Sequence, residues 1–117
     1  MGSDINTLYN QIGYTFKNEQ LMIRALTHKS LSQDNYERLE FLGDSILNFG
    51  VASILFKEFS ISEGELSIIR AHIVNKRNLA KIGSHIKLDP HILTSSNQKI
   101  SSSIRADVVE AIIGAIY

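Results

Sequence analysis

The chain has 117 residues, of which 44% are hydrophobic and 21% charged, as expected for a globular protein with one domain at most. It contains no cysteine, which excludes a disulfide scaffold and a thiolate zinc site and agrees with a reducing, cytoplasmic compartment. No run of about 18 apolar residues is present, so the sequence predicts no membrane association. Twelve basic and twelve acidic residues cancel, and this net charge of zero does not by itself indicate a nucleic-acid-binding protein.

The N-terminal part of the chain predicts two short helices and a polar loop. Asp4 can cap a first helix, which carries one apolar stripe and ends at Gly13. Asn18 opens a second helix, which continues to about Leu26. The segment LSQDN that follows is typical of a loop.

The middle of the chain predicts a long helix from about residue 36 to residue 59, followed by a shorter one. We expect apolar residues of the long helix to be buried: Leu39, Leu42, Ile46, Phe49 and Ile54. Ser62 and Glu65 then form the pattern of a capping box, in which each side chain pairs with a free backbone amide at a helix start. The helix that begins there should reach Ile73.

The C-terminal part predicts a helix around residues 78–83, a serine-rich loop and a last helix from Arg105 onward. No alternating strand pattern, internal repeat or linker is visible. The last helix has no stop signal before Tyr117, so we expect the natural protein to continue further. The predicted fold class is therefore all-α, a single helical domain over residues 1–117 that is truncated at its C-terminus.

Three carboxylates stand on one face of the long helix, at Glu37, Glu40 and Asp44. A solvated helix face usually pairs glutamate with lysine or arginine four residues on, but the residue four after Glu40 is Asp44, a like charge that destabilises a helix by about 0.2–0.5 kcal/mol. Gly43 lies between them, where glycine costs about 1 kcal/mol relative to alanine. We therefore expect another backbone to approach the helix closely at Gly43.

A second acidic pair, Asp107 and Glu110, lies three residues apart on the apolar last helix, so these carboxylates should be at least partly buried. Arg105 is one candidate partner for them. If Asp107 and Glu110 converge with Glu40 and Asp44, the four carboxylates need a cation to balance their charge. Oxygen ligands favour hard ions such as magnesium or manganese. Such an ion can activate water and stabilise charge on a phosphoryl group. The alternative is an ordinary solvated helix face.

Four segments resemble one known family in their order and spacing. They are LMIRALTHKS (21–30), NYERLEFLGDSIL (35–47), SEGELSIIRAHIVN (62–75) and ADVVEAIIGAIY (106–117). They resemble ribonuclease III, the family of endonucleases that cut double-stranded RNA, and the resemblance extends from about Leu8 to Tyr117. Bacterial members generally carry a C-terminal double-stranded-RNA-binding domain, which this chain lacks. The chain thus resembles a truncated nuclease domain of a bacterial-type ribonuclease III.

The resemblance implies an active centre and an activity. Glu40, Asp107 and Glu110 would ligate Mg²⁺, for which Mn²⁺ could substitute, and Asp44 and Glu110 would be catalytic. The implied activity is magnesium-dependent cleavage of double-stranded RNA to 5′-phosphate products with short 3′ overhangs, in RNA processing that includes ribosomal RNA.

The resemblance also implies a homodimer and a cleavage valley. Phe41 would insert into a socket on a second subunit, although plain core packing of its ring is the alternative. Glu37 and Glu63 would line the valley that receives the RNA.

Charge is sorted along the chain in a way that indicates RNA contacts. Seven acidic residues lie between residues 34 and 65, whereas residues 66–88 carry five basic residues and no acidic one. Arg70, Lys76, Arg77 and Lys99 are candidate contacts to RNA phosphates, with a solvated face as the alternative.

Two other functions are open to a helical protein with clustered acids. A di-iron carboxylate oxidoreductase needs Glu-x-x-His motifs, and the sequence has none. A catalytically inactive dimerisation or RNA-binding scaffold of the same fold remains the alternative, although a scaffold gains nothing from clustered carboxylates.

Overall fold

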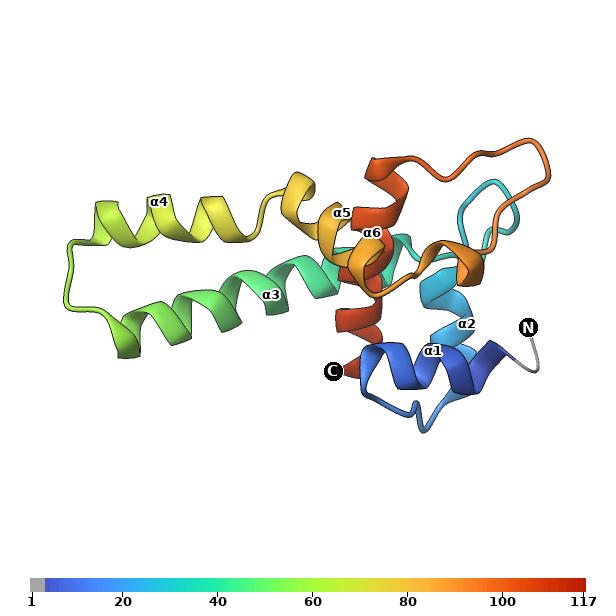
Figure 1. The fold of residues 1–117 in the computed structure, drawn as a ribbon, viewed down its shortest axis with the longest axis horizontal. Coiled ribbons are helices and arrows are strands. Elements are labelled where there is room, and N and C mark those ends of the chain that lie inside the picture. The colour runs from blue at the N-terminus through green and yellow to red at the C-terminus, as the bar shows by residue number, and fades with distance from the viewer. Residues whose placement is uncertain (1–3) are drawn as a thin grey trace.

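The computed structural model describes residues 4–117, and in this part the chain forms α-helices and one short 3-10 helix (Figure 1). The elements are α1 (Asp4–Ile12), α2 (Glu19–Leu26), α3 (Glu37–Glu58), α4 (Glu63–Ile73), α5 (Lys76–His85), η1 (Asp89–His91) and α6 (Ser102–Ile116). The β pairing in the described residues is limited to an isolated bridge between Thr27 and Leu93. The all-α prediction is confirmed, while residues 1–3 of the predicted domain lie outside the described residues.

Three sequence signals at helix ends act as predicted, whereas Asp4, the expected cap of the first helix, is itself the first described residue of α1. Gly13 takes a φ of 72° directly after α1, a conformation that glycine adopts without strain. The Asn18 side chain accepts a hydrogen bond from the backbone amide of Gln20 at the start of α2. Ser62 and Glu65 form both bonds of the capping box that begins α4.

Two helices are longer than the sequence pattern predicted. The helix expected at residues 78–83 extends over Lys76–His85, because the side chain of Asn75 caps its first turn. The last helix begins at Ser102 rather than Arg105, because Ser101 accepts a hydrogen bond from the amide of Ile104. In both cases a polar cap, rather than the first apolar residue, sets the helix start.

Helix α6 is the centre of the core. It packs against α2, α3 and α5 (Figure 1), and nine of its fifteen residues are buried. This burial explains the apolar composition of the segment and places its acidic residues within the protein. Among the buried residues is Glu110, with only 5% of its surface exposed.

Two glycines bring α3 and α6 together. A Cβ atom added at Gly43 would overlap the carbonyl oxygen of Glu110, and one at Gly114 would overlap the carbonyl oxygen of Leu39. The two helices therefore touch backbone to backbone at this crossing. The prediction that another backbone approaches closely at Gly43 is confirmed.

The second half of α3 forms a hairpin with α4 that projects away from the rest of the chain (Figure 1). The prediction that the apolar residues of α3 are buried is wrong for Leu42, Phe49 and Ile54, which are 39%, 75% and 61% exposed. It is right for Leu39, which lies where α3 meets α6. The reason is that α6 covers only the first part of α3, and α4 alone is too short to bury all sides of the remainder.

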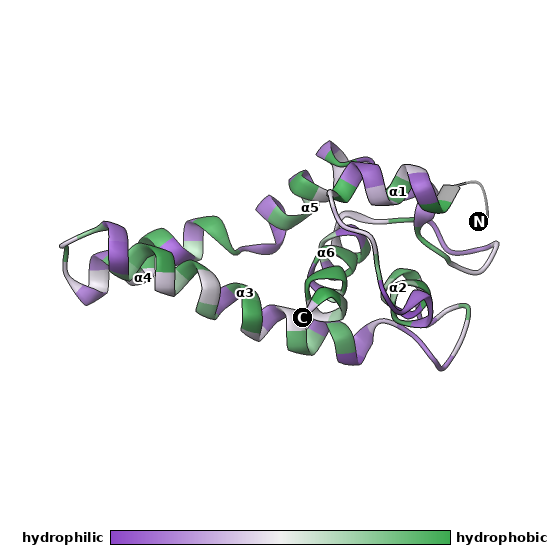
Figure 2. Cartoon of the chain, turned by 90° about the horizontal axis from the view of Figure 1, so that it is seen from below, coloured by the Kyte–Doolittle hydropathy of each residue, from purple (hydrophilic) through white to green (hydrophobic). Residues whose placement is uncertain are grey.

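Helix α3 carries many apolar residues, drawn in green among purple hydrophilic ones in Figure 2, and several of them are exposed. By length and composition, one helix in residues 4–117 could cross a membrane: α3, most of which is not buried within the chain. A single such helix is weak evidence for a membrane span.

Replacing Gly43 with alanine should destabilise the chain, by about 1–3 kcal/mol or more, because the added methyl group must push α3 away from α6. Gly50, on the same helix, has no atom within 4 Å of an added Cβ, so Gly50→Ala should stabilise by about 0.5–1 kcal/mol. Chemical denaturation of both variants measures the difference. Equal effects would show that the helices do not need a glycine at their crossing.

Candidate functional site

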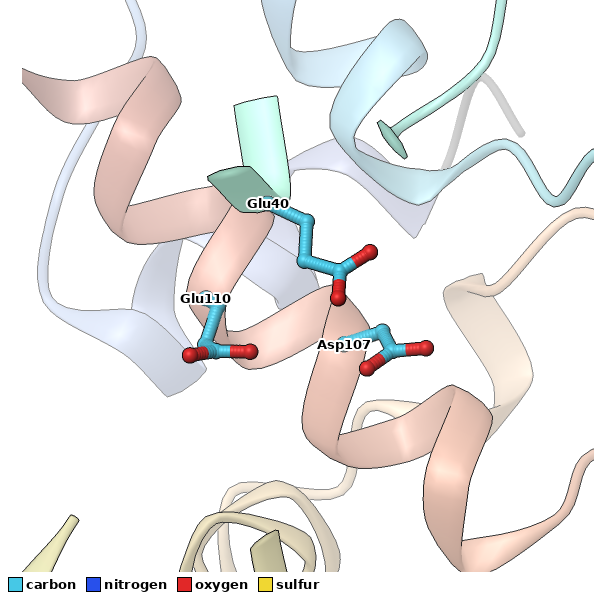
Figure 3. Close-up of side chains that lie close together, drawn as sticks. All are labelled: Glu40, Asp107 and Glu110. Atoms are coloured by element: carbon cyan, nitrogen blue, oxygen red, sulfur yellow. The ribbon is translucent and has the colours of Figure 1, made fainter. Parts of the chain in front are cut away.

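Three carboxylates converge where α3 crosses α6. One oxygen atom from each of Glu40, Asp107 and Glu110 lies within 4.8 Å of the others, and Figure 3 shows the three side chains close together. Glu40 lies one turn before Gly43, and Gly43 contacts the backbone of Glu110. The glycine contact thus places the acid of α3 beside the two acids of α6.

Two further acids lie at the edge of this cluster. Asp44 and Glu37 line a pocket of about 330 Å³ together with Glu40 and Glu110. Asp44 is exposed, and the side-chain amide of Asn48 donates to its carboxylate at 3.4 Å. Glu37, Glu40, Asp44 and Glu110 therefore line one acidic pocket. Asp107 joins Glu40 and Glu110 in the tight group of three, whereas Asp44 and Glu37 stand outside that group.

The structure separates Glu63 from this pocket. Glu63 begins α4 and accepts a hydrogen bond from the hydroxyl of Ser67 at 3.0 Å. With Arg70 it lines a different pocket, of about 490 Å³, between α3 and α4. Within one chain neither residue reaches the acid cluster, so their predicted roles in the valley and in RNA contact stay predictions.

Phe41 lies at the edge of the acidic pocket and is 77% exposed. This exposure excludes core packing within the chain, the alternative considered for its ring. Its insertion into a second subunit stays a prediction.

Burial and crowding of like charges disfavour ionised carboxylates in the cluster. Burial and then the neighbouring Asp44 raise the pKa of Glu110 to about 8. Burial and then Asp107 raise the pKa of Glu40 to about 7. Both values lie well above the ordinary 4.5, so without a bound cation these groups keep protons near neutral pH.

The basic residue paired with the acid cluster is Lys76, and not Arg105, the candidate partner in the sequence analysis. The Lys76 ammonium lies 3.0 Å from Oδ1 of Asp107 and donates to the hydroxyl of Ser103 at 3.2 Å. The guanidinium of Arg105 instead makes two hydrogen bonds of 2.7 Å to Asp89, in η1. Nothing in the sequence indicated this pairing, because Lys76 and Asp107 lie 31 positions apart.

The tyrosine directly before the acidic helix also belongs to the site. The hydroxyl of Tyr36 donates to Oδ2 of Asp107 at 3.5 Å, a long hydrogen bond, and the residue is 4% exposed. Burial and then Asp107 raise the pKa of this hydroxyl, so it stays a donor. Its position beside Glu37 is the only sequence signal that could have indicated this contact.

The donor set fits a hard divalent cation. Oδ1 of Asp107 is buried and, although it faces the Lys76 ammonium, receives no hydrogen bond of good geometry. When Glu40 and Glu110 are ionised, one ammonium cannot balance the three carboxylates. Oxygen-only ligands with residual negative charge are those that Mg²⁺ and Mn²⁺ prefer.

A basic pocket lies beside the acidic one, between α5 and the start of α6. Its volume is about 540 Å³, and no acidic residue lines it. Its lining residues are Lys76, Arg77, Ala80, Lys81, Ser84, Ser102, Ser103 and Arg105. Lys76 and Arg77, two of the predicted RNA contacts, thus share one concave surface, whereas Lys99 is exposed on the loop before α6.

Comparison with known proteins agrees with this arrangement. A family model described as ribonuclease-III-like matches residues 18–117. Ribonuclease 3 of Francisella tularensis subsp. novicida is 45% identical over 121 aligned residues, which cover 100% of this chain and 53% of that protein. Its counterpart in Francisella tularensis subsp. holarctica matches equally well.

Solved structures agree with the sequence matches. The nuclease domain of ribonuclease III from Campylobacter jejuni superimposes with a TM-score of 0.92 at 44% identity, over 96% of this chain and 83% of that one. That structure is described as showing flexibility in a region involved in dimer formation. Dicer from Pichia stipitis matches with a TM-score of 0.70 at 32% identity, over 86% of this chain and 46% of that one.

The fold is that of the helical nuclease domain found in ribonuclease III, and the acid cluster lies at its central helix crossing. The chain belongs to the ribonuclease III family. It spans about half the length of the curated relatives it matches.

The raised pKa values make the stability of the metal-free chain depend on pH. Above pH 4.5 the unfolded chain releases protons that folded Glu40 and Glu110 keep, so the free energy of unfolding should fall as pH rises from about 5 to about 8. Thermal denaturation in a chelator, compared with the Glu40→Gln, Glu110→Gln double variant, isolates this contribution. Wild-type stability that does not fall relative to the variant over this range would contradict it.

Proposed function

We propose that the chain is the catalytic domain of a magnesium-dependent endoribonuclease that cleaves double-stranded RNA. The convergence of Glu40, Asp107 and Glu110 at the crossing of α3 and α6 supports this function most strongly. Membership of the ribonuclease III family supports the substrate class.

The residues of the acidic pocket have distinct tasks. Glu40, Asp107 and Glu110 would hold the divalent ion, and Asp44 and Glu110 would face the reacting phosphate. When bound, the ion supplies Lewis acidity that activates water and neutralises charge on the phosphoryl group. Hydrolysis breaks the bond from phosphorus to the 3′ oxygen and leaves a 5′ phosphate on the next nucleotide.

The basic pocket beside the acidic one is suited to the RNA backbone. A-form RNA is recognised by shape, through phosphates and 2′-hydroxyls. Lys76 and Arg77 offer charged donors to a phosphate group, and Lys81 adds a third on the same surface. Arg70 and Lys99 are further candidate contacts. Because the net charge is zero, binding by this domain alone should be weak and steeply salt-dependent.

A homodimer through α3 explains two features that one chain leaves unexplained. It would cover Phe41 and the apolar surface of the projecting hairpin. It would also place two acidic pockets along one valley, lined by Glu37 and Glu63, so that each cuts one strand and the products carry short 3′ overhangs. A ribosomal-RNA precursor in the cytoplasm is the substrate and location that this function suggests.

Replacing Glu110 with glutamine should abolish magnesium-dependent cleavage of long duplex RNA while leaving duplex binding intact, because the amide keeps the shape but loses the anionic ligand. Gel analysis of products and a mobility-shift assay measure the two properties. Glu19→Gln, at an exposed position on α2, is the control and should cut normally. Full activity of the Glu110 variant would refute the assignment, and a wild type that binds but never cuts would favour the scaffold.

Replacing Phe41 with alanine should weaken dimerisation at least tenfold, because a large aromatic anchor in an interface commonly contributes about 2 kcal/mol or more. Sedimentation equilibrium over a range of protein concentrations gives the dimer dissociation constant. Ile82→Ala, which truncates an exposed apolar residue on α5, is the matched control. An unchanged dissociation constant in the Phe41 variant would place the dimer interface elsewhere.

A further inference from the structure

We propose that Lys76 is a tethered counter-ion of the metal site, which holds Asp107 in the metal-free protein and is displaced when a divalent cation binds. The inference rests on the proposed function, since it assumes that the acid cluster binds such an ion. In this role Lys76 lowers the affinity of the site for the metal ion, and so sets the metal concentration at which the site fills.

The geometry places Lys76 at the boundary between two surfaces of opposite charge. Among the described residues, Lys76 alone lines both the acidic pocket and the basic pocket. Its ammonium lies 3.0 Å from Oδ1 of Asp107, an atom that is buried and without a hydrogen bond of good geometry. The Asp107 carboxylate is also one of the three that converge, with those of Glu40 and Glu110.

The ammonium and a divalent ion compete for the same carboxylate, that of Asp107. A cation coordinated by Asp107 would face a second positive charge a few ångströms away if Lys76 kept its present position. Such repulsion opposes binding of the ion at this range, even with the strong screening typical of a protein surface. Filling the site therefore requires Lys76 to move.

The structure offers Lys76 a second position. Its side chain is 60% exposed and already donates to the hydroxyl of Ser103, on the wall of the basic pocket. Because the side chain has four rotatable bonds, it can turn from Asp107 into that pocket without moving α5. There its charge is available to an RNA phosphate, so filling the metal site and presenting a phosphate contact would be coupled.

A purely structural role is the alternative. Lys76 is the first residue of α5, and its bond to Ser103 could simply fix α5 against α6. In that case removing the charge would disorder Asp107 and weaken metal binding. The two roles thus predict changes of opposite sign.

Isothermal titration of Mn²⁺ into the RNA-free protein tests the proposal through affinity, independently of cleavage. Lys76→Met should bind Mn²⁺ about tenfold more tightly than the wild type, because the competing charge is gone. Lys76→Arg restores a positive charge and should return the affinity to near the wild-type value. Lys81→Met, which removes a lysine from the basic pocket outside the acidic one, should leave the affinity unchanged.

Equal or weaker Mn²⁺ binding by Lys76→Met would overturn the proposal while leaving the metal site in place. An equal gain in Mn²⁺ affinity in Lys81→Met would also overturn it, because the gain would then come from the change in overall charge and not from the position of Lys76. If none of the proteins bound Mn²⁺, both the metal site of the proposed function and the role of Lys76 would fail. Circular dichroism melting of each metal-free variant confirms that the protein being titrated is folded.

Discussion

Gly43 on α3 and Gly114 on α6 let the two helices approach until their backbones touch. Any larger side chain at either position would overlap a carbonyl oxygen of the other helix. This contact sets the distance between Glu40 on one helix and Asp107 and Glu110 on the other, and so creates the acid cluster. The intrinsic helix penalty of Gly43 is thus offset by an arrangement that no residue with a side chain would permit.

The second organising feature is the separation of charge. The acidic pocket and the basic pocket lie side by side, and Lys76 stands between them. An acid cluster in a protein that binds a polyanion would repel its own ligand unless a cation neutralised it. A divalent ion in the acidic pocket and phosphates in the basic pocket would remove that conflict.

The sequence predicted which acids converge better than it predicted which apolar side chains are exposed. The acids could be found because their spacing conflicts with helix stability, and Gly43 because it is costly where it stands. Capping residues such as Ser62 act locally, so their roles could also be inferred. The exposure of Phe49 and the pairing of Lys76 could not, because they depend on which helix covers which. An apolar residue gives the same sequence pattern whether it packs in the core of its own chain or against another molecule.

The central claim is that the carboxylates of α3 and α6 together bind one hard cation. Anomalous diffraction from crystals of the protein soaked in Mn²⁺ tests it most directly. We predict a manganese peak between Glu40, Asp107 and Glu110, within coordinating distance of an oxygen from each. A peak elsewhere, or none at saturating Mn²⁺ with these side chains in their present positions, would contradict the claim.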